Sequence, residues 1–305
     1  MLAKKYIIAV SGGPDSMYLL NKYYKKVKCV CHVNYNVRQS AIKDEWTVRD
    51  FCTKNKVKLE ILNVSESMYK KYKELVGNNF EQIARSIRYD FFLKMSKKYK
   101  VKTVLVAHHL DDFLETCIMQ EEKKSIRLFY GMHENSEYKG LKIYRPLLKK
   151  KLTKKHIISY CAKNSIPFGI DETNFHDKYT RNKIRFRNQN LTPQQYKDML
   201  KKYESYNKKN RKHYLKTIAL FNAWKKTNFS IIYYKNKIYE TQYDKNIIFE
   251  LLKYFNEDNI SLNKINSIIV YLNTFLIKND KRKKFRLSKR NNVWIEKDKV
   301  VFSFR

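Results

Sequence analysis

Short apolar runs alternate with helical patterns through the first two hundred residues, and this alternation restricts the fold more than any other feature. The runs that read as buried strands are Tyr6 to Val10, Val27 to Val33, Val57 to Val64 and Val101 to Ala107. Between them, apolar residues recur at helical spacing, as in residues 41–52 and 80–95. Buried strands separated by helices predict an α/β fold, a doubly wound parallel sheet with helices on both faces. Ligands of such sheets bind beyond the carboxyl ends of the strands, so functional residues should directly follow strands.

The sequence changes character after residue 195. Very basic helices are predicted over 196–224 and amphipathic helices over 247–255 and 262–276, while 229–239 has β character and the tail resembles a small β meander. The length of 305 residues suggests two domains, since one domain takes roughly 150 residues. We therefore expect one domain over residues 1–195 and a smaller, mainly helical α+β domain over 196–305.

The net charge is strongly positive. Sixty-five Lys and Arg residues against 29 Asp and Glu give a formal charge of +36. Such a charge destabilises a compact chain by self-repulsion, which favours a polyanionic partner, nucleic acid first and an anionic membrane surface second. The apolar runs are far shorter than a membrane-spanning helix. A composition rich in Lys, Asn and Tyr, inherited from an AT-rich genome, is the alternative explanation. We expect a soluble, cytoplasmic protein.

The five cysteines are an odd number and include no C-x-x-C pair. Cys29 and Cys31 lie two residues apart in a predicted strand and therefore share one face, which suits neither a local disulfide nor a zinc pair. Buried thiols in a reducing compartment are the favoured interpretation.

A glycine-containing loop follows the first strand and opens the first helix. It consists of Ser11, Gly12, Gly13, Pro14, Asp15 and Ser16. Two glycines let backbone N–H groups converge on an anion, and the helix N-terminus adds its dipole. The two serine hydroxyls suit a phosphate, and the aspartate suits Mg²⁺ held against that phosphate. The loop is not a kinase-type P-loop, and an ordinary strand-to-helix turn with an acidic first turn is the alternative.

A second polar cluster follows the fourth strand, in Ala107-His108-His109-Leu110-Asp111-Asp112-Phe113-Leu114-Glu115-Thr116. If a helix begins near Leu110, then His108, Asp112 and Glu115 project to one side at spacings of four and three. Carboxylates beside a histidine suit a cationic substrate, Mg²⁺ or a proton-transfer site. First-turn acids that complement the helix dipole are the alternative.

These two motifs occur with three others, and together they resemble the tRNA(Ile)-lysidine synthetases, a family of N-type ATP pyrophosphatases with a PP-loop. The three further motifs are His32 to Arg38 with Ser40 and Asp44; Glu81 to Tyr89; and Asp171 to Asn174 with Arg181-Asn182-Lys183-Ile184-Arg185. The resemblance covers about residues 5–187. The sequence departs from the family at Tyr35-Asn36, where His-Gly is usual, and it resembles a compact form.

The resemblance implies an adenine nucleotide alpha hydrolase-like, Rossmann-like catalytic domain and a ligase activity. Members use ATP to adenylate the C2 oxygen of the wobble cytidine in the isoleucine tRNA whose anticodon is CAU. The ε-amine of free lysine then displaces AMP and leaves lysidine, which pairs with A rather than G. Because that amine has a reference pKa of about 10.4, its proton must be removed before attack.

The resemblance also implies roles for individual residues. The ATP-binding set comprises Ser11, Gly12, Gly13, Pro14, Asp15 and Ser16, with His32, Val33 and Asn34 by the adenosine and Arg38 on a phosphate. Asp112 and Glu115 are candidates to hold lysine, with His108 or Asp111 taking its proton. Arg88, like Arg85, suits the lysine carboxylate or the nucleotide phosphates. Arg181 and Arg185 suit charge on the α-phosphate or the target nucleotide. Mg²⁺ is expected on Asp15.

Two basic runs suit contacts with a tRNA backbone. Eight of the thirteen residues from Lys278 to Arg290 are basic, and our candidates among them are Lys281, Arg282, Lys283 and Lys284. The second run lies at residues 149–155. Solvated surface charge is the alternative for both, since phosphate contacts supply affinity and little sequence reading. Rival functions are a PP-loop tRNA thiolase, which would need a persulfide cysteine or a C-x-x-C, and a non-catalytic RNA-binding protein.

Overall fold

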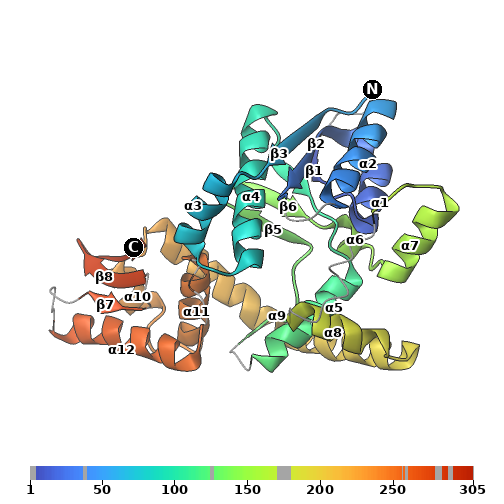
Figure 1. Ribbon diagram of the computed structural model, residues 1–305. Coiled ribbons are helices and arrows are strands. Elements are labelled where there is room, and N and C mark those ends of the chain that lie inside the picture. Colours follow the sequence, from blue (N-terminus) through green and yellow to red (C-terminus); the bar gives the residue numbers. More distant parts are fainter. Residues whose placement is uncertain are drawn as a thin grey trace. The chain divides into compact units, whose positions relative to one another are not determined.

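The computed structural model describes residues 5–36, 40–123, 127–169, 180–255, 257, 260–278, 284–287 and 291–304. The chain forms two compact units (Figure 1). Unit 1 comprises residues 1–116 and 132–189, and unit 2 comprises 117–131 and 190–305. The sequence patterns did not predict that residues 117–131 would belong to the second unit. Among the described residues, no helix is both long and apolar enough to cross a membrane.

Unit 1 is built on a six-stranded, mainly parallel sheet, as the alternating pattern predicted. Its elements are β1 (Tyr6–Ala9), α1 (Pro14–Tyr23), a 3₁₀ turn (Tyr24–Lys26), β2 (Val27–Asn34), α2 (Ser40–Lys54), β3 (Leu59–Asn63), α3 (Glu66–Val76), α4 (Phe80–Lys98), β4 (Thr103–Leu105), α5 (Leu110–Glu122, which continues into unit 2), β5 (Asn135–Tyr138), β6 (Leu141–Tyr144), α6 (Pro146–Lys149), α7 (Lys154–Lys163) and α8 (Thr180–Gln189). The strand order is β3-β2-β1-β4-β6-β5. The order reverses between β1 and β4, which is the point where doubly wound sheets bind ligands.

The β5–β6 hairpin was not predicted. Its two strands have only four residues each, β5 is mostly exposed, and β6 has just two buried apolar residues, Leu141 and Ile143, so the signal in the sequence is short. The turn between them places Lys139 and Gly140 at φ values of 47° and 86°, as a tight two-residue hairpin turn requires. β5 pairs antiparallel with β6 and ends an otherwise parallel sheet.

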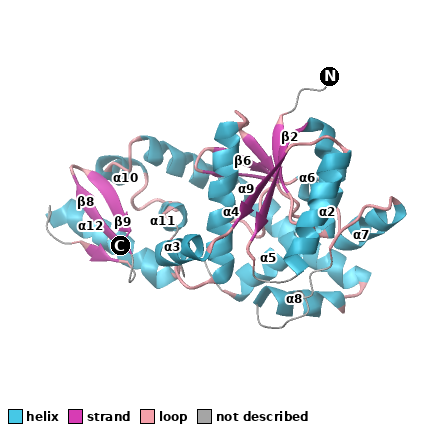
Figure 2. Cartoon of the chain, turned by 45° about the horizontal axis from the view of Figure 1, so that its top comes forward, coloured by secondary structure: helices cyan, strands magenta, loops and turns pink. Residues whose placement is uncertain are grey.

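Helices cover both faces of this sheet (Figure 2). On one face, Met17 of α1, Val48 of α2 and Ile157 of α7 pack against Ile8 and Val30. On the other face, α4 packs its Phe92 and Met95 against the strand residues Ile7, Cys29, Cys31 and Val104. All five cysteines are buried free thiols, which confirms the expectation from their spacing. Because both faces are buried, the strands need continuous apolar sequence.

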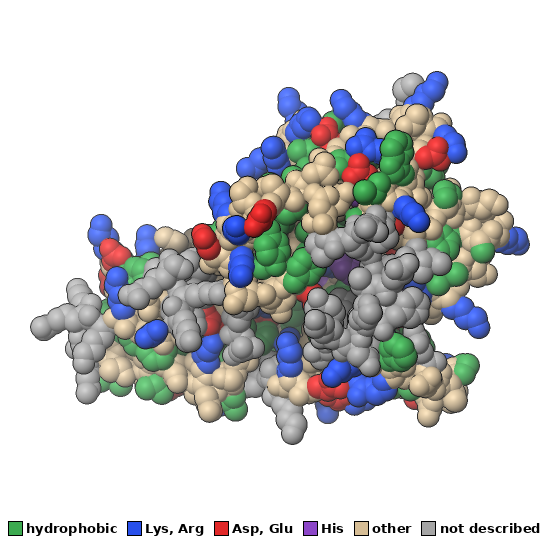
Figure 3. Space-filling view, in the orientation of Figure 1, with side chains coloured by type: hydrophobic (Ala, Val, Ile, Leu, Met, Phe, Trp, Pro, Cys, Tyr) green, Lys and Arg blue, Asp and Glu red, His purple; other side chains and the backbone are tan. Residues whose placement is uncertain are grey.

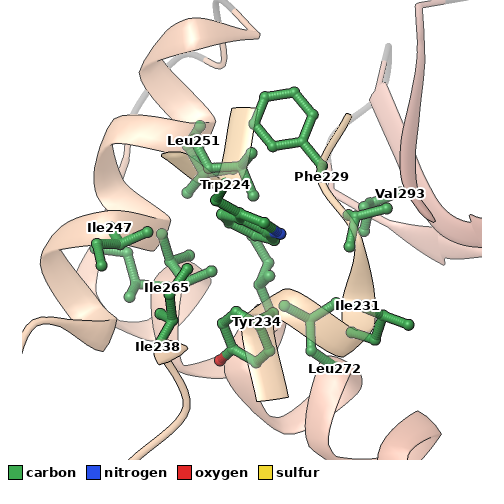
Figure 4. Close-up of a cluster of buried hydrophobic side chains, with 14 of the residues drawn as sticks. Trp224, Phe229, Ile231, Tyr234, Ile238, Ile247, Leu251, Ile265, Leu272 and Val293 are labelled. Carbon is green, nitrogen blue, oxygen red and sulfur yellow. The ribbon is translucent and has the colours of Figure 1, made fainter. Parts of the chain in front are cut away.

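Unit 2 consists of helices and a small antiparallel sheet. Its elements are α9 (Pro193–Lys226), α10 (Ile231–Lys237), α11 (Asp244–Tyr254), α12 (Leu262–Lys278), β7 (Phe285–Arg286), β8 (Asn291–Glu296) and β9 (Lys299–Phe304). The strand order β7-β8-β9 confirms the predicted meander. Trp224, which is fully buried, lies at the centre of the core, with Phe229, Tyr234, Leu251 and other apolar side chains around it (Figure 4).

The prediction of β structure over 229–239 was wrong, because most of this segment forms α10. The Ser230 hydroxyl caps the helix by accepting a hydrogen bond from the Tyr233 backbone N–H. Ile231, Tyr234 and Ile238 are buried at helical spacing around Trp224. The adjacent branched and aromatic residues favour strands locally, but burial of one helical face outweighs that preference.

Candidate active site

The glycine-containing loop joins β1 to α1 at the carboxyl end of β1. Gly13 is the N-cap of α1 and Pro14 occupies the first turn, where no backbone donor is needed. The Ser16 hydroxyl donates to the Gly13 carbonyl at 2.9 Å and accepts from the Ser11 backbone N–H at 3.1 Å. The Ser16 hydroxyl therefore shapes the loop itself, and its predicted contact with a phosphate stays a prediction.

Gly12 permits close packing of the loop against α2. Its φ is +95°, and a Cβ added there would lie 2.7 Å from Asp44 Cβ and 2.9 Å from the Asp44 backbone oxygen. A Cβ on Gly169, whose N–H donates to the Gly12 carbonyl at 3.0 Å, would also meet the Asp44 carboxylate. Gly12 is thus required by the backbone of Asp44, whereas at Gly169 only the carboxylate end of that side chain is in the way. Asp44 is a buried residue of the recognised motif to which sequence reasoning gave no role.

His109 lies among three carboxylates at the carboxyl end of β4. Its Nε2 atom is 3.6 Å from Asp15 Oδ1 and 3.4 Å from Asp112 Oδ2, and its Nδ1 atom is 3.2 Å from Asp111 Oδ2. Burial opposes the charged form of the ring, but the contact with Asp111 and the charges of Asp112 and Asp15 outweigh it and raise the pKa of His109. The three carboxylates therefore stabilise the charged form of this ring more than water does for a free imidazole.

Lys154 links the loop to the second motif. Its Nζ donates to Asp15 Oδ2 at 2.6 Å, and its backbone N–H donates to Asp111 Oδ2 at 2.7 Å. The position is fixed because α7 begins here, capped by the Thr153 side chain. The sequence placed Lys154 in a basic run suited to contacts with a tRNA backbone, with surface charge as the alternative, and the structure brings its amine to Asp15.

The other oxygen of Asp15, Oδ1, is buried and has no hydrogen-bonding partner among the described residues. A buried carboxylate oxygen without such a partner fits a cation ligand beside a phosphate loop. The described residues include no group of three or more His, Cys, Asp or Glu side chains arranged to hold a metal ion. Mg²⁺ typically takes one or two carboxylates and completes its shell with water and substrate phosphates, so Asp15 is the residue that could hold it.

Asp112 and Glu115 form a buried pair on one side of α5, at 7% and 4% exposure. Arg185 of α8 donates from Nε to Glu115 Oε1 at 2.7 Å, and its Nη2 lies 3.5 Å from Asp112 Oδ1. The His109 backbone N–H donates to Asp112 Oδ2 at 3.0 Å. The predicted carboxylate pair is therefore assembled and already holds one cationic side chain, which is the chemistry needed to bind an ammonium group.

Arg145 holds His108 at the same edge of the sheet. The arginine is 4% exposed, and burial lowers its pKa. Its Nε donates to His108 Nδ1 at 3.2 Å, while one terminal nitrogen donates to the His133 carbonyl and to Ser136 Oγ, both at 2.9 Å. No sequence pattern indicated this residue, because its partners lie in separate segments: His108 follows β4, His133 precedes β5, and Ser136 is in β5.

The end of β2 contributes the segment that we assigned to adenosine. His32 is buried, with Nδ1 2.9 Å from the Val10 carbonyl oxygen, and burial lowers its pKa. The Asn34 side chain donates to Glu45 and accepts from the Asn36 backbone N–H. Val33 is half-buried between them. These contacts use the polar groups within the protein, and their role toward a nucleotide stays a prediction.

Two further candidates that the structure describes, Arg88 and Lys284, have other neighbours. Arg88 is exposed on α4 and acts electrostatically on Tyr35. Lys284 lies over the Trp294 ring, 4.6 Å from its centroid. The remaining candidates lie outside the described residues or side chains, and they are Arg38, the Arg181 side chain, Lys281, Arg282 and Lys283. Basic side chains are spread over the face seen in Figure 3.

Sequence reasoning missed His109, Lys154 and Arg145 as members of the site. His109 could have been found, since it stands within the recognised motif, directly before the predicted start of the helix. The side-chain contact of Lys154 with Asp15 spans 139 residues of sequence, and that of Arg145 with His108 spans 37. Spacing rules within one helix or strand do not reach such pairs.

Comparison with known proteins gives consistent matches. The family model for the PP-loop domain matches residues 2–194. The tRNA(Ile)-lysidine synthase of Ureaplasma parvum serovar 3 is 37% identical over 98% of this chain and 87% of its own length. The tRNA(Ile)-lysidine synthase of Malacoplasma penetrans is 39% identical over 98% of both chains.

A solved structure shares the fold. The U34-tRNA thiolase NcsA of Methanococcus maripaludis aligns with a TM-score of 0.51 and 18% identity, over 68% of this chain and 73% of its own. At this identity the match shows common architecture and does not favour the thiolase alternative.

Proposed function

The chain belongs to the tRNA(Ile)-lysidine synthase family, whose members are ligases, and we propose that it converts the wobble cytidine of CAU-anticodon tRNA(Ile) to lysidine with ATP and free lysine. In the first step the cytidine O2 attacks the α-phosphate, an O–P bond forms and pyrophosphate leaves. In the second step the lysine ε-nitrogen attacks C2, AMP leaves, and the nitrogen gives up its proton.

The observation that carries this proposal is the meeting of two motifs at the sheet's topological switch point. The glycine loop after β1 supplies an anion site at a helix N-terminus, and α5 after β4 supplies a buried pair of carboxylates. Lys154 joins the two, because its side chain contacts Asp15 and its backbone contacts Asp111. A phosphate donor and a cationic acceptor would thus be held at one edge of the sheet.

The carboxylates suit the lysine end of the reaction. Asp112 and Glu115 already share Arg185, so a second cation would complete a set of two anions and two cations. The ε-ammonium is stabilised there until its proton is taken, for which Asp111 and His108 are the candidates. Arg185, with Arg181, would offset charge that develops on the α-phosphate.

Mg²⁺ belongs to this proposal through Asp15. Its buried Oδ1 is the oxygen that would hold the ion, and Lys154 would exchange Asp15 for a nucleotide phosphate when ATP binds. Bound Mg²⁺ would neutralise phosphate charge and favour departure of pyrophosphate.

We propose that unit 2 docks tRNA and that the protein acts in the cytoplasm. Residues 201–305 carry 25 basic and 9 acidic residues, a denser positive charge than the preceding part of the chain. Such charge supplies affinity for phosphates without base specificity. Buried free thiols fit a reducing compartment.

The test combines label transfer with a loop variant. The protein is incubated with CAU-anticodon tRNA(Ile), ATP, Mg²⁺ and radiolabelled lysine, and label in RNA is measured together with AMP release. We expect ATP-dependent labelling by the wild type and by the surface control Asp50→Ala. Asp15→Ala should lose labelling and AMP release while tRNA binding persists. Absence of label from RNA in the wild type would reject the proposed function.

A further inference from the structure

We propose that Arg145 is a positioning residue that holds His108 as the neutral Nε2–H tautomer, so that His108 donates a hydrogen bond to an anionic substrate oxygen and does not accept the proton of lysine. The inference deepens the proposed function and rests on it. It assigns a role to a buried arginine that lies between β6 and α6 and belongs to none of the recognised motifs.

The guanidinium of Arg145 is fixed on several sides. Three hydrogen bonds leave it, to His108 Nδ1, to the His133 carbonyl and to Ser136 Oγ. Its backbone N–H donates to the Glu134 carbonyl at 2.9 Å, and the following Pro146 restricts its backbone. A side chain that is 4% exposed and held at both ends cannot turn away from the histidine without breaking these bonds.

The contact determines which nitrogen of His108 carries the proton. A guanidinium has only donors, so Nδ1 must accept, and the proton of a neutral ring then lies on Nε2. Protonation of Nδ1 would place two donors and two positive charges against each other at 3.2 Å. Arg145 therefore opposes the imidazolium form that a general base must reach after accepting a proton.

A ring in this tautomer can serve the substrate as a hydrogen-bond donor through its Nε2–H group. His108 lies in the segment between β4 and α5, at the edge of the sheet where the glycine loop also lies. An Nε2–H group there suits an oxygen that bears negative charge. Such an oxygen belongs either to the adenylated cytidine or to the carboxylate of lysine. Because the contact with Arg145 opposes protonation of His108, Asp111 is the candidate left to accept the lysine proton.

The first experiment reads the tautomer directly, without any turnover. Histidines are labelled with ¹⁵N in the full-length protein, and the His108 signals are assigned by their loss in His108→Gln, with the exposed His156→Gln as the matched control. We expect a pyridine-type shift at Nδ1 and a pyrrole-type shift at Nε2 across neutral pH. A protonated Nδ1, or an imidazolium at neutral pH, would overturn the proposal.

The second experiment compares His108→Gln with His108→Ala. The glutamine amide still donates to the anionic oxygen, so activity should fall by at most about tenfold. His108→Ala loses a hydrogen bond to a charged group, so its activity should fall by about tenfold to a hundredfold. Loss of a general base would cost about a hundredfold or more in both variants. A larger KM for lysine with normal adenylation identifies the lysine carboxylate as the acceptor, and slower adenylation identifies the cytidine adenylate. Equal, large losses in both variants would contradict donation.

The third experiment removes the cation. In Arg145→Gln the amide can still contact Nδ1, but the charge that opposes protonation is gone, so His108 should titrate at a higher pH by the same ¹⁵N shifts. Ser136→Ala, which removes one anchor of Arg145 and leaves the His108 contact, should keep the wild-type titration. If Arg145→Gln does not fold, the wild-type tautomer and the His108→Gln comparison still decide. Failure of the proposed function would show as absent labelling of RNA by the wild type. The tautomer measurement needs no turnover, so the two failures can be told apart.

Discussion

Replacement of Gly12 by Ala tests whether the loop conformation depends on contact with α2. The added Cβ at φ +95° would meet the Cβ, Cα and backbone oxygen of Asp44 at 2.7, 2.9 and 2.9 Å. Two of these atoms belong to the backbone of α2, so rotation of a side chain cannot relieve the clash. Either the loop or the helix must move, and the phosphate site changes shape.

The hairpin turn provides a matched control. Gly140 has a φ of +86°, and nothing lies within 4 Å of a Cβ added there. Gly140→Ala should therefore cost only the left-handed conformation, about 1–2 kcal/mol, less the roughly 0.4–1 kcal/mol gained by restricting the unfolded chain. Gly12→Ala adds an overpacking cost of about 1–3 kcal/mol. We expect the two variants to differ by that amount, with Gly12→Ala the less stable.

Native-state hydrogen exchange of peptides from α1 and α2 measures the free energy of opening in unit 1, and calorimetry measures ATP binding. Gly12→Ala should lose protection in both helices and bind ATP more weakly, while Gly140→Ala should bind it normally. Asp44→Gly in the Gly12→Ala background should rescue only part of the loss, because the backbone atoms remain. Equal stability of the two alanine variants, or full rescue by Asp44→Gly, would refute the steric argument.

Three further perturbations test the site and the tail. Glu115→Gln should raise the KM for lysine by about tenfold to a hundredfold, because it loses a charge-assisted hydrogen bond of about 1.5–3 kcal/mol, while adenylated tRNA accumulates. A normal lysine KM would remove Glu115 from the lysine site, and Glu121→Gln in unit 2 is the control. The pKa of His109 is raised in the folded state, so its stabilisation is full below its ordinary pKa of about 6.5 and is lost as pH rises through the raised value. The free energies of unfolding of wild type and His109→Gln, from urea titrations without Mg²⁺, should therefore converge at high pH and diverge in acid. A difference that does not change with pH would contradict this. Alanine at Lys281, Arg282, Lys283 and Lys284 should weaken the binding of cognate and non-cognate tRNA equally. It should also reduce the slope of log affinity against log salt concentration by up to about 0.9 per phosphate contact. Alanine at Lys54, Lys70, Lys71 and Lys73 should leave affinity and slope unchanged, and an unaltered slope in the tail variant would favour surface charge without a ligand.

The loop and helix motifs of the site were predictable because their geometry is local. A glycine pair after a strand fixes the turn and the helix N-terminus, and the spacing of residues 111–115 along α5 fixes which carboxylates share a side. The lysidine synthase family was likewise recognisable from those motifs, and near-full-length relatives confirm it.

The sequence by itself determined the parallel α/β architecture of unit 1, because strands buried on both faces require uninterrupted apolar runs at fixed intervals. Tertiary structure alone decided the helical form of residues 231–237, where a buried tryptophan selects one face of a segment whose local preference is for strands. It also decided which cations enter the site. Lys154 and Arg145 reach Asp15 and His108 from distant parts of the chain, and such pairings depend on how elements pack rather than on the spacing of residues within one element.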